Sequence, residues 1–114
     1  MKIAFASEDD QGLRATLCTD LGRCPYYTVV DLDGDKVWDV KILSNPYQTS
    51  QAPGMVPVFV KSQGAQVIIA GGMKPQVVEL FDEFEIEVVT TRAQSTLKDI
   101  LMAYLRGEIK GPLL

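Results

Sequence analysis

The stretch Val67-Ile68-Ile69-Ala70-Gly71-Gly72 decides the fold class of this chain. An unbroken apolar run without polar alternation is typical of a strand that is buried on both faces, as in a parallel sheet. Gly71-Gly72 ends the run, and Pro75 suits the first position of a helix. The stretch therefore predicts a buried strand that is followed by a helix.

Towards the C-terminus, helix and strand patterns continue to alternate. Apolar residues recur at helical spacing in two segments, formed by Val77, Val78, Phe81 and by Leu97, Ile100, Leu101, Tyr104, Leu105. Between them, Ile86–Thr90 is rich in β-branched residues and predicts a strand. The last helix begins near Ser95 or Thr96, either of which can cap it, and Gly107 ends it.

Towards the N-terminus the patterns are those of strands. Lys2–Ala6 is a short apolar run, and Tyr26–Leu32 is rich in β-branched and aromatic residues. Asp33-Gly34 is a strong hairpin signal, so Lys36–Leu43 is the half-exposed antiparallel return strand. Its alternation puts three apolar residues on one face, Trp38, Val40 and Ile42. We expect the hairpin aromatics to pack in the core or along its edge.

The segment Ser44–Gly54 joins the two halves and is rich in turn-forming residues without a core pattern. A loop of this length in a small domain is often functional. Met55–Gln63 then predicts a short helix, with Pro57 in its first turn and Gly64 at its end.

A chain of 114 residues has the size of one domain, and we predict a single domain over residues 1–114. The predicted order is strand, hairpin, helix, strand, helix, strand, helix. Right-handed crossovers then give an α/β fold, with a mixed five-stranded sheet and helices on both faces.

The charge balance bears on partners and location. Eleven basic and fifteen acidic residues give a net charge of −4, which argues against a nucleic-acid partner and against an anionic membrane surface. No apolar run approaches the roughly 20 residues of a spanning helix, and Met1–Ala6 does not form a signal peptide. We expect a cytoplasmic protein that is a monomer or a weak homodimer.

Histidine is absent, and only Cys18 and Cys24 carry thiols. The absence of histidine excludes Ser-His-Asp and Cys-His catalysis. Two thiolates at this spacing do not predict a typical structural zinc site. The two cysteines can pair in principle, but a reducing compartment favours free thiols.

The loop Leu21–Tyr26 gathers the clearest candidate residues. Gly22 permits unusual backbone angles, Arg23 offers a fork of donors suited to anions, and Pro25 holds Cys24 extended. Two interpretations stand, an anion clamp or a structural arginine in a turn. Cys24 and Cys18 are likewise either thiolate ligands of an iron–sulfur species or buried small apolar residues.

Gly71-Gly72 lies between a buried strand and the start of a helix. Backbone N–H groups at such a place can cradle an anion, aided by the helix dipole. The alternative is a tight turn whose glycines allow close packing. No nucleotide-binding pattern accompanies the pair.

Acidic residues form two groups, Glu8-Asp9-Asp10 after the first strand, and Asp31 with Asp33 near the hairpin turn. Carboxylates that converge on Mg²⁺ would allow hydrolysis by two metal ions. The first strand, Ile3-Ala4-Phe5-Ala6, carries no carboxylate. A solvated acidic loop is the simpler interpretation.

Several of these segments together resemble the dinitrogenase iron–molybdenum cofactor biosynthesis family. They are Lys2-Ile3-Ala4-Phe5, Leu21-Gly22-Arg23-Cys24-Pro25-Tyr26-Tyr27, Asn45-Pro46, Val67-Ile68-Ile69-Ala70-Gly71-Gly72 and the closing helix before Gly107-Glu108. The resemblance implies a ribonuclease H-like three-layer sandwich. The family's loop usually reads His-Phe-Gly-Arg, whereas this chain has Asp20-Leu21-Gly22-Arg23.

The resemblance also implies a function, that of a small non-enzymatic carrier for iron–sulfur-type or iron–molybdenum-type clusters that are bound transiently. The partners are then a metal cluster or another anionic small ligand, and a protein that donates or accepts the cluster. The predicted binding residues are Gly22, Arg23, Cys24, Asn45, Gly71 and Gly72, with Cys24 and Cys18 as metal ligands.

Cys24 is the preferred ligand because it lies beside Arg23 in the matching loop, and Asn45–Gly54 is the predicted lid. Two other functions stay open. One is a regulatory or scaffolding module of the same fold that has lost cluster binding. The other is a divergent metal-dependent hydrolase.

Overall fold

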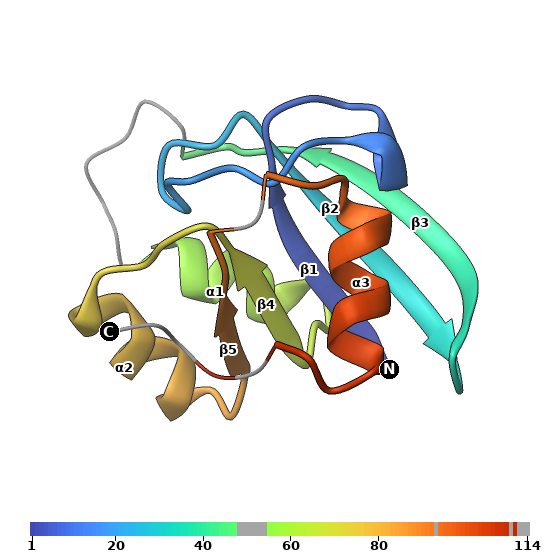
Figure 1. Ribbon diagram of the computed structural model, residues 1–114. Helices are drawn as coiled ribbons and strands as arrows, with labels where there is room; N and C mark the ends of the chain where they lie inside the picture. Colours follow the sequence, from blue (N-terminus) through green and yellow to red (C-terminus); the bar gives the residue numbers. More distant parts are fainter. Residues whose placement is uncertain (48–54, 93, 110, 112–114) are drawn as a thin grey trace.

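A computed structural model describes residues 1–47, 55–92, 94–109 and 111 (Figure 1). The strands and helices, in chain order, are β1 Lys2–Ser7, β2 Tyr26–Asp33, β3 Lys36–Ser44, α1 Met55–Ser62, β4 Val67–Ala70, α2 Pro75–Glu83, β5 Glu87–Thr90 and α3 Leu97–Leu105. A short 3₁₀ helix, Gly12–Arg14, lies between β1 and β2. The element order matches the prediction, and most boundaries agree within one residue.

The strands form one sheet in the order β3-β2-β1-β4-β5. β1 pairs with β2, and β2 with β3, in antiparallel fashion. β1 pairs with β4, and β4 with β5, in parallel fashion. The predicted mixed five-stranded sheet is confirmed, with β1 at the junction between its antiparallel and parallel halves.

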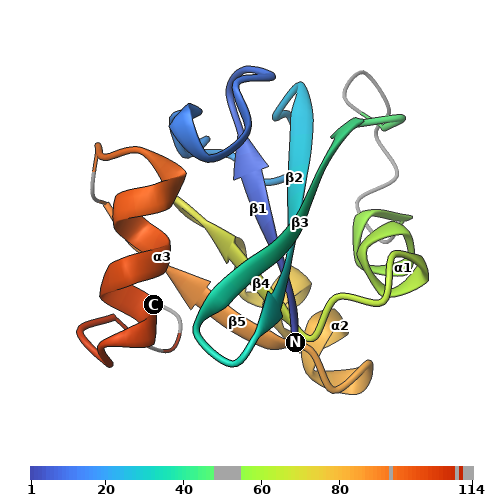
Figure 2. The same ribbon diagram turned by 90° about the vertical axis from the view of Figure 1, so that its right-hand side faces the viewer.

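Helices cover both faces of the sheet, as Figure 2 shows, with α3 on one side and α1 and α2 on the other. Each face has its own buried apolar cluster. Alternation along β1 divides its side chains between them, because Ala4 and Ala6 face α1 and α2, whereas Ile3 and Phe5 face α3. The three layers are consistent with the ribonuclease H-like fold.

The apolar run of β4 is buried on both faces, as its sequence predicts. Ile68 and Ala70 join the α1–α2 cluster, and Val67 and Ile69 join the α3 cluster. Burial of each large aliphatic side chain stabilises the fold by about 1.5–3 kcal/mol. β4 therefore anchors both layers of helices on the centre of the sheet.

Local signals fix where the helices begin and end. Pro75 occupies the first turn of α2, and the Thr96 side chain caps α3 by accepting a hydrogen bond from Asp99 N at 3.3 Å. Gly64, just after α1, has a φ of 78°, a conformation that favours glycine. Of the two residues that the sequence offers as the N-cap of α3, Thr96 rather than Ser95 is the cap. Within the described residues, no helix is long and apolar enough to cross a membrane.

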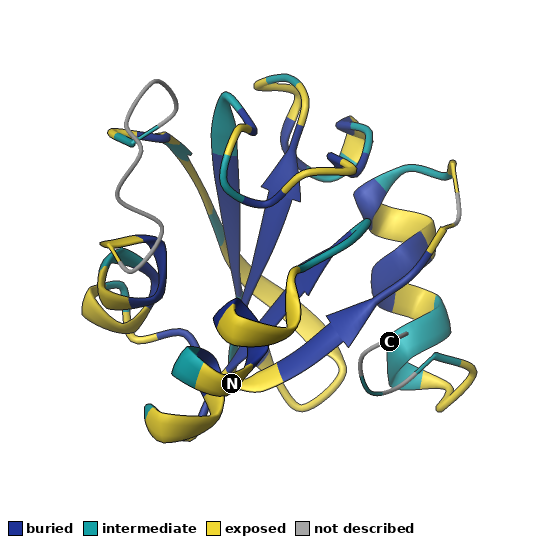
Figure 3. Ribbon diagram, turned by 90° about the vertical axis from the view of Figure 1, so that its left-hand side faces the viewer, coloured by how far each residue is buried: buried dark blue, intermediate teal, exposed yellow. Residues whose placement is uncertain are grey.

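The edge strand β3 is more exposed than its sequence predicts (Figure 3). Trp38 leaves 77% of its surface in solvent, so the expectation that it packs on the hairpin is wrong, whereas Tyr27 is buried. The strand pairing passes from Asp31–Asp39 to Leu32–Val37, which makes Trp38 the extra residue of a β-bulge. At this outer edge, no described helix covers the indole.

Candidate functional site

The chain between β1 and β2 includes residues 16–25, here called the cysteine loop, which lie at the C-terminal ends of β1 and β4 (Figure 1). Cys18 N donates a hydrogen bond to Ala6 O of β1 at 2.8 Å. Gly71 N, just after β4, donates to Cys18 O at 2.9 Å. The loop is therefore attached by its backbone to the two central strands.

Gly71 and Gly72 allow the cysteine loop to approach this closely. A Cβ atom on Gly71 would lie 2.7 Å from Thr19 Cα and 2.9 Å from Cys18 O, and one on Gly72 would lie 3.1 Å from Thr19 O. Real Cβ atoms essentially never make the two closest of these contacts. The Gly71 N–H is engaged within the protein, so close packing accounts for this glycine.

Asn45 fastens the other side of the cysteine loop to the end of β3. Its Nδ2 donates to Cys24 O at 2.8 Å and to Gly22 O at 3.3 Å. Its backbone N donates to Pro25 O at 2.9 Å, and its Oδ1 accepts from Tyr47 N at 2.9 Å. Asn45 thus lies beside Gly22 and Cys24, two other residues that the sequence analysis assigns to the binding site, and it holds their backbone in place.

Arg23 extends from the same turn into solvent. Its side chain is 86% exposed and its Nε lies 4.0 Å from Asp20 Oδ2. Exposed pairs of this kind contribute little to stability. Asp20 Oδ1 also accepts a hydrogen bond from Gly22 N at 3.1 Å, so this carboxylate shapes the turn. The guanidinium itself is accessible to a ligand.

Cys18 and Cys24 are both free, buried thiols. Cys18 Sγ donates a hydrogen bond to Asp20 O at 3.4 Å, and Cys24 Sγ donates to Leu21 O at 3.2 Å. The two side chains are also within hydrogen-bonding reach of one another. The cysteine loop therefore brings together the two thiols that the sequence predicts as metal ligands.

The environment separates the two thiols electrostatically. The hydrogen bond with the Cys24 side chain is the main cause that lowers the pKa of Cys18 to about 7. The same interaction, together with burial, raises the pKa of Cys24 well above its usual range. The two shifts have opposite directions, so Cys18 is the thiol that ionises more readily, whereas Cys24 stays protonated.

The sequence profile of a family described as dinitrogenase iron-molybdenum cofactor matches residues 1–107. The chain belongs to the dinitrogenase iron-molybdenum cofactor family. The resemblance of the separate sequence segments to this family is confirmed. A comparison with curated proteins found no significant match.

Solved structures support the fold of this dinitrogenase-cofactor family member. The crystal structure of PH0822 is 29% identical, covers 96% of this chain and 95% of its own, and gives a TM-score of 0.83. The apo orange protein from Desulfovibrio gigas is 23% identical over 99% of this chain and 96% of its own, with a TM-score of 0.86. TM1290 from Thermotoga is 17% identical over 96% and 91%, with a TM-score of 0.77.

Tyr27 of this family member is a site residue that the sequence analysis missed. Its buried hydroxyl donates to Leu21 O at 2.7 Å, and this carbonyl also accepts from Cys24 Sγ. Burial and the neighbouring Cys24 raise the pKa of the Tyr27 phenol, which keeps it neutral. The sequence signal that could have identified Tyr27 is its place directly after Gly22–Tyr26. A tyrosine that is buried beside this loop needs a hydrogen-bond partner for its hydroxyl, and the loop carbonyls are the nearest acceptors.

The structure does not bring the two acidic groups together. Glu8-Asp9-Asp10 follow the C-terminal end of β1, whereas Asp31 pairs with Lys2 at the opposite end of that strand. Among the described residues, no group of three or more His, Cys, Asp or Glu side chains can hold a metal ion. The predicted lid Asn45–Gly54 lies mostly at residues 48–54, outside the described residues.

Proposed function

We propose that this protein is a non-enzymatic carrier that binds an iron–sulfur-type metal cluster transiently at the cysteine loop, through the Cys18 thiolate. The observation that carries the proposal is the pairing of Cys18 with Cys24 at the ends of β1 and β4. Ligands of open α/β sheets favour the carboxyl ends of strands. Thiolates are the natural ligands of iron–sulfur species.

The two cysteines take different roles in this proposal. Cys18 retains 7% exposure and has the lowered pKa, whereas Cys24 is 0% exposed and stays protonated. This favours Cys18 as the ligand, in place of Cys24, which the sequence favours. Cys24 then supplies a hydrogen bond to the Cys18 sulfur, and such bonds tune thiolate clusters.

Arg23 supplies the only other ligand-directed group in this proposal. Its exposed guanidinium, on the same turn, suits an anionic cluster. A single thiolate does not complete a cluster site, so the remaining ligands come from a small thiol or from a protein that donates or accepts the cluster. Incomplete ligation favours release, which is what a carrier requires.

Anaerobic reconstitution with iron and sulfide tests the proposal. We expect the wild-type protein to gain visible charge-transfer absorption and bound iron, and Cys18→Ser to abolish both. Cys24→Ser is the matched control, because it removes the neighbouring buried thiol and leaves Cys18 in place. We expect it to retain the cluster and release it faster. Undiminished iron uptake by Cys18→Ser would overturn the assignment of Cys18.

A regulatory or scaffolding module without a cluster is the second candidate. It is favoured by the lack of a three-residue metal group among the described residues and by the structural hydrogen bonds of Gly71 and Asn45. Under this alternative, the wild-type protein takes up no iron in the same reconstitution. The separation of Asp31 from Glu8-Asp9-Asp10 disfavours the hydrolase.

A further inference from the structure

Strand β3 forms one edge of the sheet, and no described strand pairs with its outer side. It is nine residues long and contains no proline. An open edge offers unpaired N–H and C=O groups to a further strand. Val37, Trp38 and Ile42 expose 43%, 77% and 42% of their surfaces along it. The edge therefore offers unpaired backbone hydrogen-bonding groups together with exposed apolar side chains.

The backbone pattern shows which residues of β3 point outward. Asn45 N donates to Pro25 O at 2.9 Å, which places a hydrogen-bonded pair at the start of β2. In antiparallel strands, every second residue bonds to the same neighbour. Leu43 and Lys41 thus direct their backbone groups towards β2, and the backbone groups of Val40 and Ile42 face outward.

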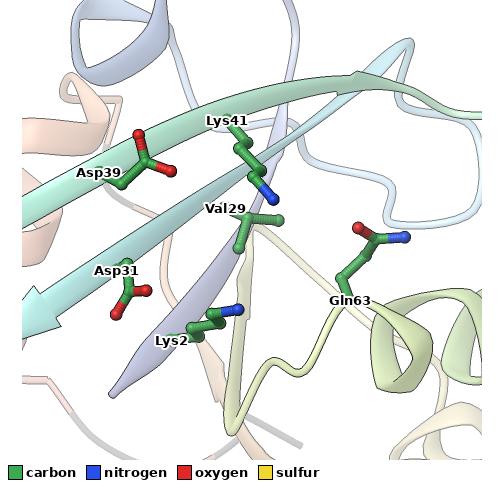
Figure 4. A pocket seen from close by; sticks show the side chains of 6 residues that line it. All are labelled: Lys2, Val29, Asp31, Asp39, Lys41 and Gln63. Carbon is green, nitrogen blue, oxygen red and sulfur yellow. The ribbon is translucent and has the colours of Figure 1, made fainter.

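A row of charged residues across the sheet ends at this edge with two carboxylates directly opposite one another. In the register of the strands, Lys2 of β1 lies opposite Asp31 of β2, and Asp31 lies opposite Asp39 of β3. These three residues line a cavity of about 80 Å³ together with Val29, Lys41 and Gln63 (Figure 4). Like charges directly opposite one another are destabilising. Among the ion pairs of the described residues, none involves Asp31 or Asp39.

A second copy of the chain places a lysine directly opposite Asp39 if the two β3 edges pair antiparallel about Val40. Asp39 of each copy then lies opposite Lys41 of the other, and Trp38 lies opposite Ile42. The charge row becomes Lys2, Asp31, Asp39 and the second copy's Lys41. A centre at Lys41 or at Asp39 would instead place like charges against one another, so the charges favour the centre at Val40 over these two registers.

We propose that β3 mediates a weak homodimer in which two copies of this chain pair antiparallel about Val40 and join their sheets. The contact rests on one strand from each copy, so it forms reversibly and depends on protein concentration. The pairing is centred on Val40, whereas Asn45, which holds the cysteine loop, follows the C-terminal end of β3. This pairing is independent of the proposed cluster carriage.

The single tryptophan of the chain reports on this interface directly, because Trp38 lies in it. We expect sedimentation velocity to show a monomer–dimer equilibrium between about 1 µM and 1 mM, the range of weak association. The fluorescence emission of Trp38 should shift to shorter wavelength over the same range as water leaves the indole.

Charge exchange tests the register. Asp39→Lys alone and Lys41→Asp alone each create two like-charge contacts per dimer, and we expect each to raise the dissociation constant about tenfold. The double variant Asp39→Lys/Lys41→Asp restores opposite charges, and it should dimerise as the wild type does. Glu79→Lys, an exposed charge reversal on α2, is the matched control and should leave the dissociation constant unchanged.

Three results would each overturn the proposal. They are a monomer throughout the concentration range, a dimer whose Trp38 emission does not shift, and a double variant as weakened as the single ones. Circular dichroism of every variant establishes that it is folded. Because the substituted side chains are exposed, we expect all variants to retain the wild-type spectrum.

Discussion

The cysteine loop and the edge strand β3 both flank β2, but they are constrained in opposite ways. The loop has little regular secondary structure, yet its thiols are buried and its backbone is bonded to β1, β4 and Asn45. Strand β3 is regular over most of its length and largely exposed. Close packing and long-range hydrogen bonds, rather than regular secondary structure, therefore hold these segments in place. Substitutions in the loop should accordingly cost more stability than substitutions on β3.

The largest effect is expected for Gly71→Ala. The new Cβ would lie 2.7 Å from Thr19 Cα and 2.9 Å from Cys18 O, and backbone cannot move aside as a side chain does. We expect a loss of about 3 kcal/mol in the free energy of unfolding, measured by urea denaturation. Gly22→Ala is the control, because its Cβ would meet only Asp20 Oδ1, at 3.8 Å. Equal stability of the two variants would contradict this packing.

Asn45→Ala should have the next largest effect. It removes the Nδ2 donor from the carbonyls of Cys24 and Gly22 and the acceptor from Tyr47 N, in a buried place. We expect a loss of about 2 kcal/mol in the free energy of unfolding. Gln66→Ala removes an exposed amide whose Oε1 accepts from Lys2 N at 3.2 Å. This control should cost less than about 0.5 kcal/mol.

Local patterns in the sequence were sufficient to predict the elements of the fold. The apolar run Val67–Ala70, the Asp33-Gly34 turn and the spacing from Leu97 to Leu105 each correspond to one element at the predicted place. These signals act within a few residues, so they are readable without knowledge of the tertiary structure. The layers followed because helices that alternate with parallel strands must cover the sheet.

Long-range packing decided the parts that could not be predicted. Nothing near Gly71 in the sequence indicates that it packs on Thr19, and nothing near Cys24 indicates that Cys18 has the lower pKa. Trp38 was expected to pack because aromatic residues usually do, but its place depends on which strand lies at the edge. Strand order and the seating of the cysteine loop are tertiary properties.

The pH dependence of stability compares the two thiols of the cysteine loop. The pKa of Cys18 is lowered from 9.0 to about 7, so between these values the unfolded chain binds the proton and the folded chain does not. Stability should therefore rise by about 1–2 kcal/mol from pH 7 to pH 9, and this gain is lost as the pH falls through 7.

Above about pH 9 the sign reverses. The raised pKa values of Cys24 and Tyr27 mean that the folded state then retains protons that the unfolded chain releases. Urea denaturation in reductant should therefore give a maximum of stability near pH 9. Cys18→Ser should remove the rise below this maximum. A rise of equal size in that variant would show that another group titrates.

The smallest effect is expected for Trp38→Ala. Because 77% of this side chain is already exposed, its loss should change the free energy of unfolding by less than about 0.5 kcal/mol, measured by circular dichroism at low micromolar concentration. Phe81→Ala, a fully buried aromatic on α2, should cost about 3–5 kcal/mol in the same assay.

The concentration dependence of the effect of Trp38→Ala also shows whether the β3 edge binds a second copy of the chain or binds nothing. If β3 of one copy pairs with β3 of another, the wild type gains stability by mass action as its concentration rises, and the variant gains less. The difference between the two should therefore widen from low micromolar to near millimolar concentration. A difference that stays constant would mean that β3 is exposed because nothing binds there, and the contrast with the cysteine loop would be one of packing alone.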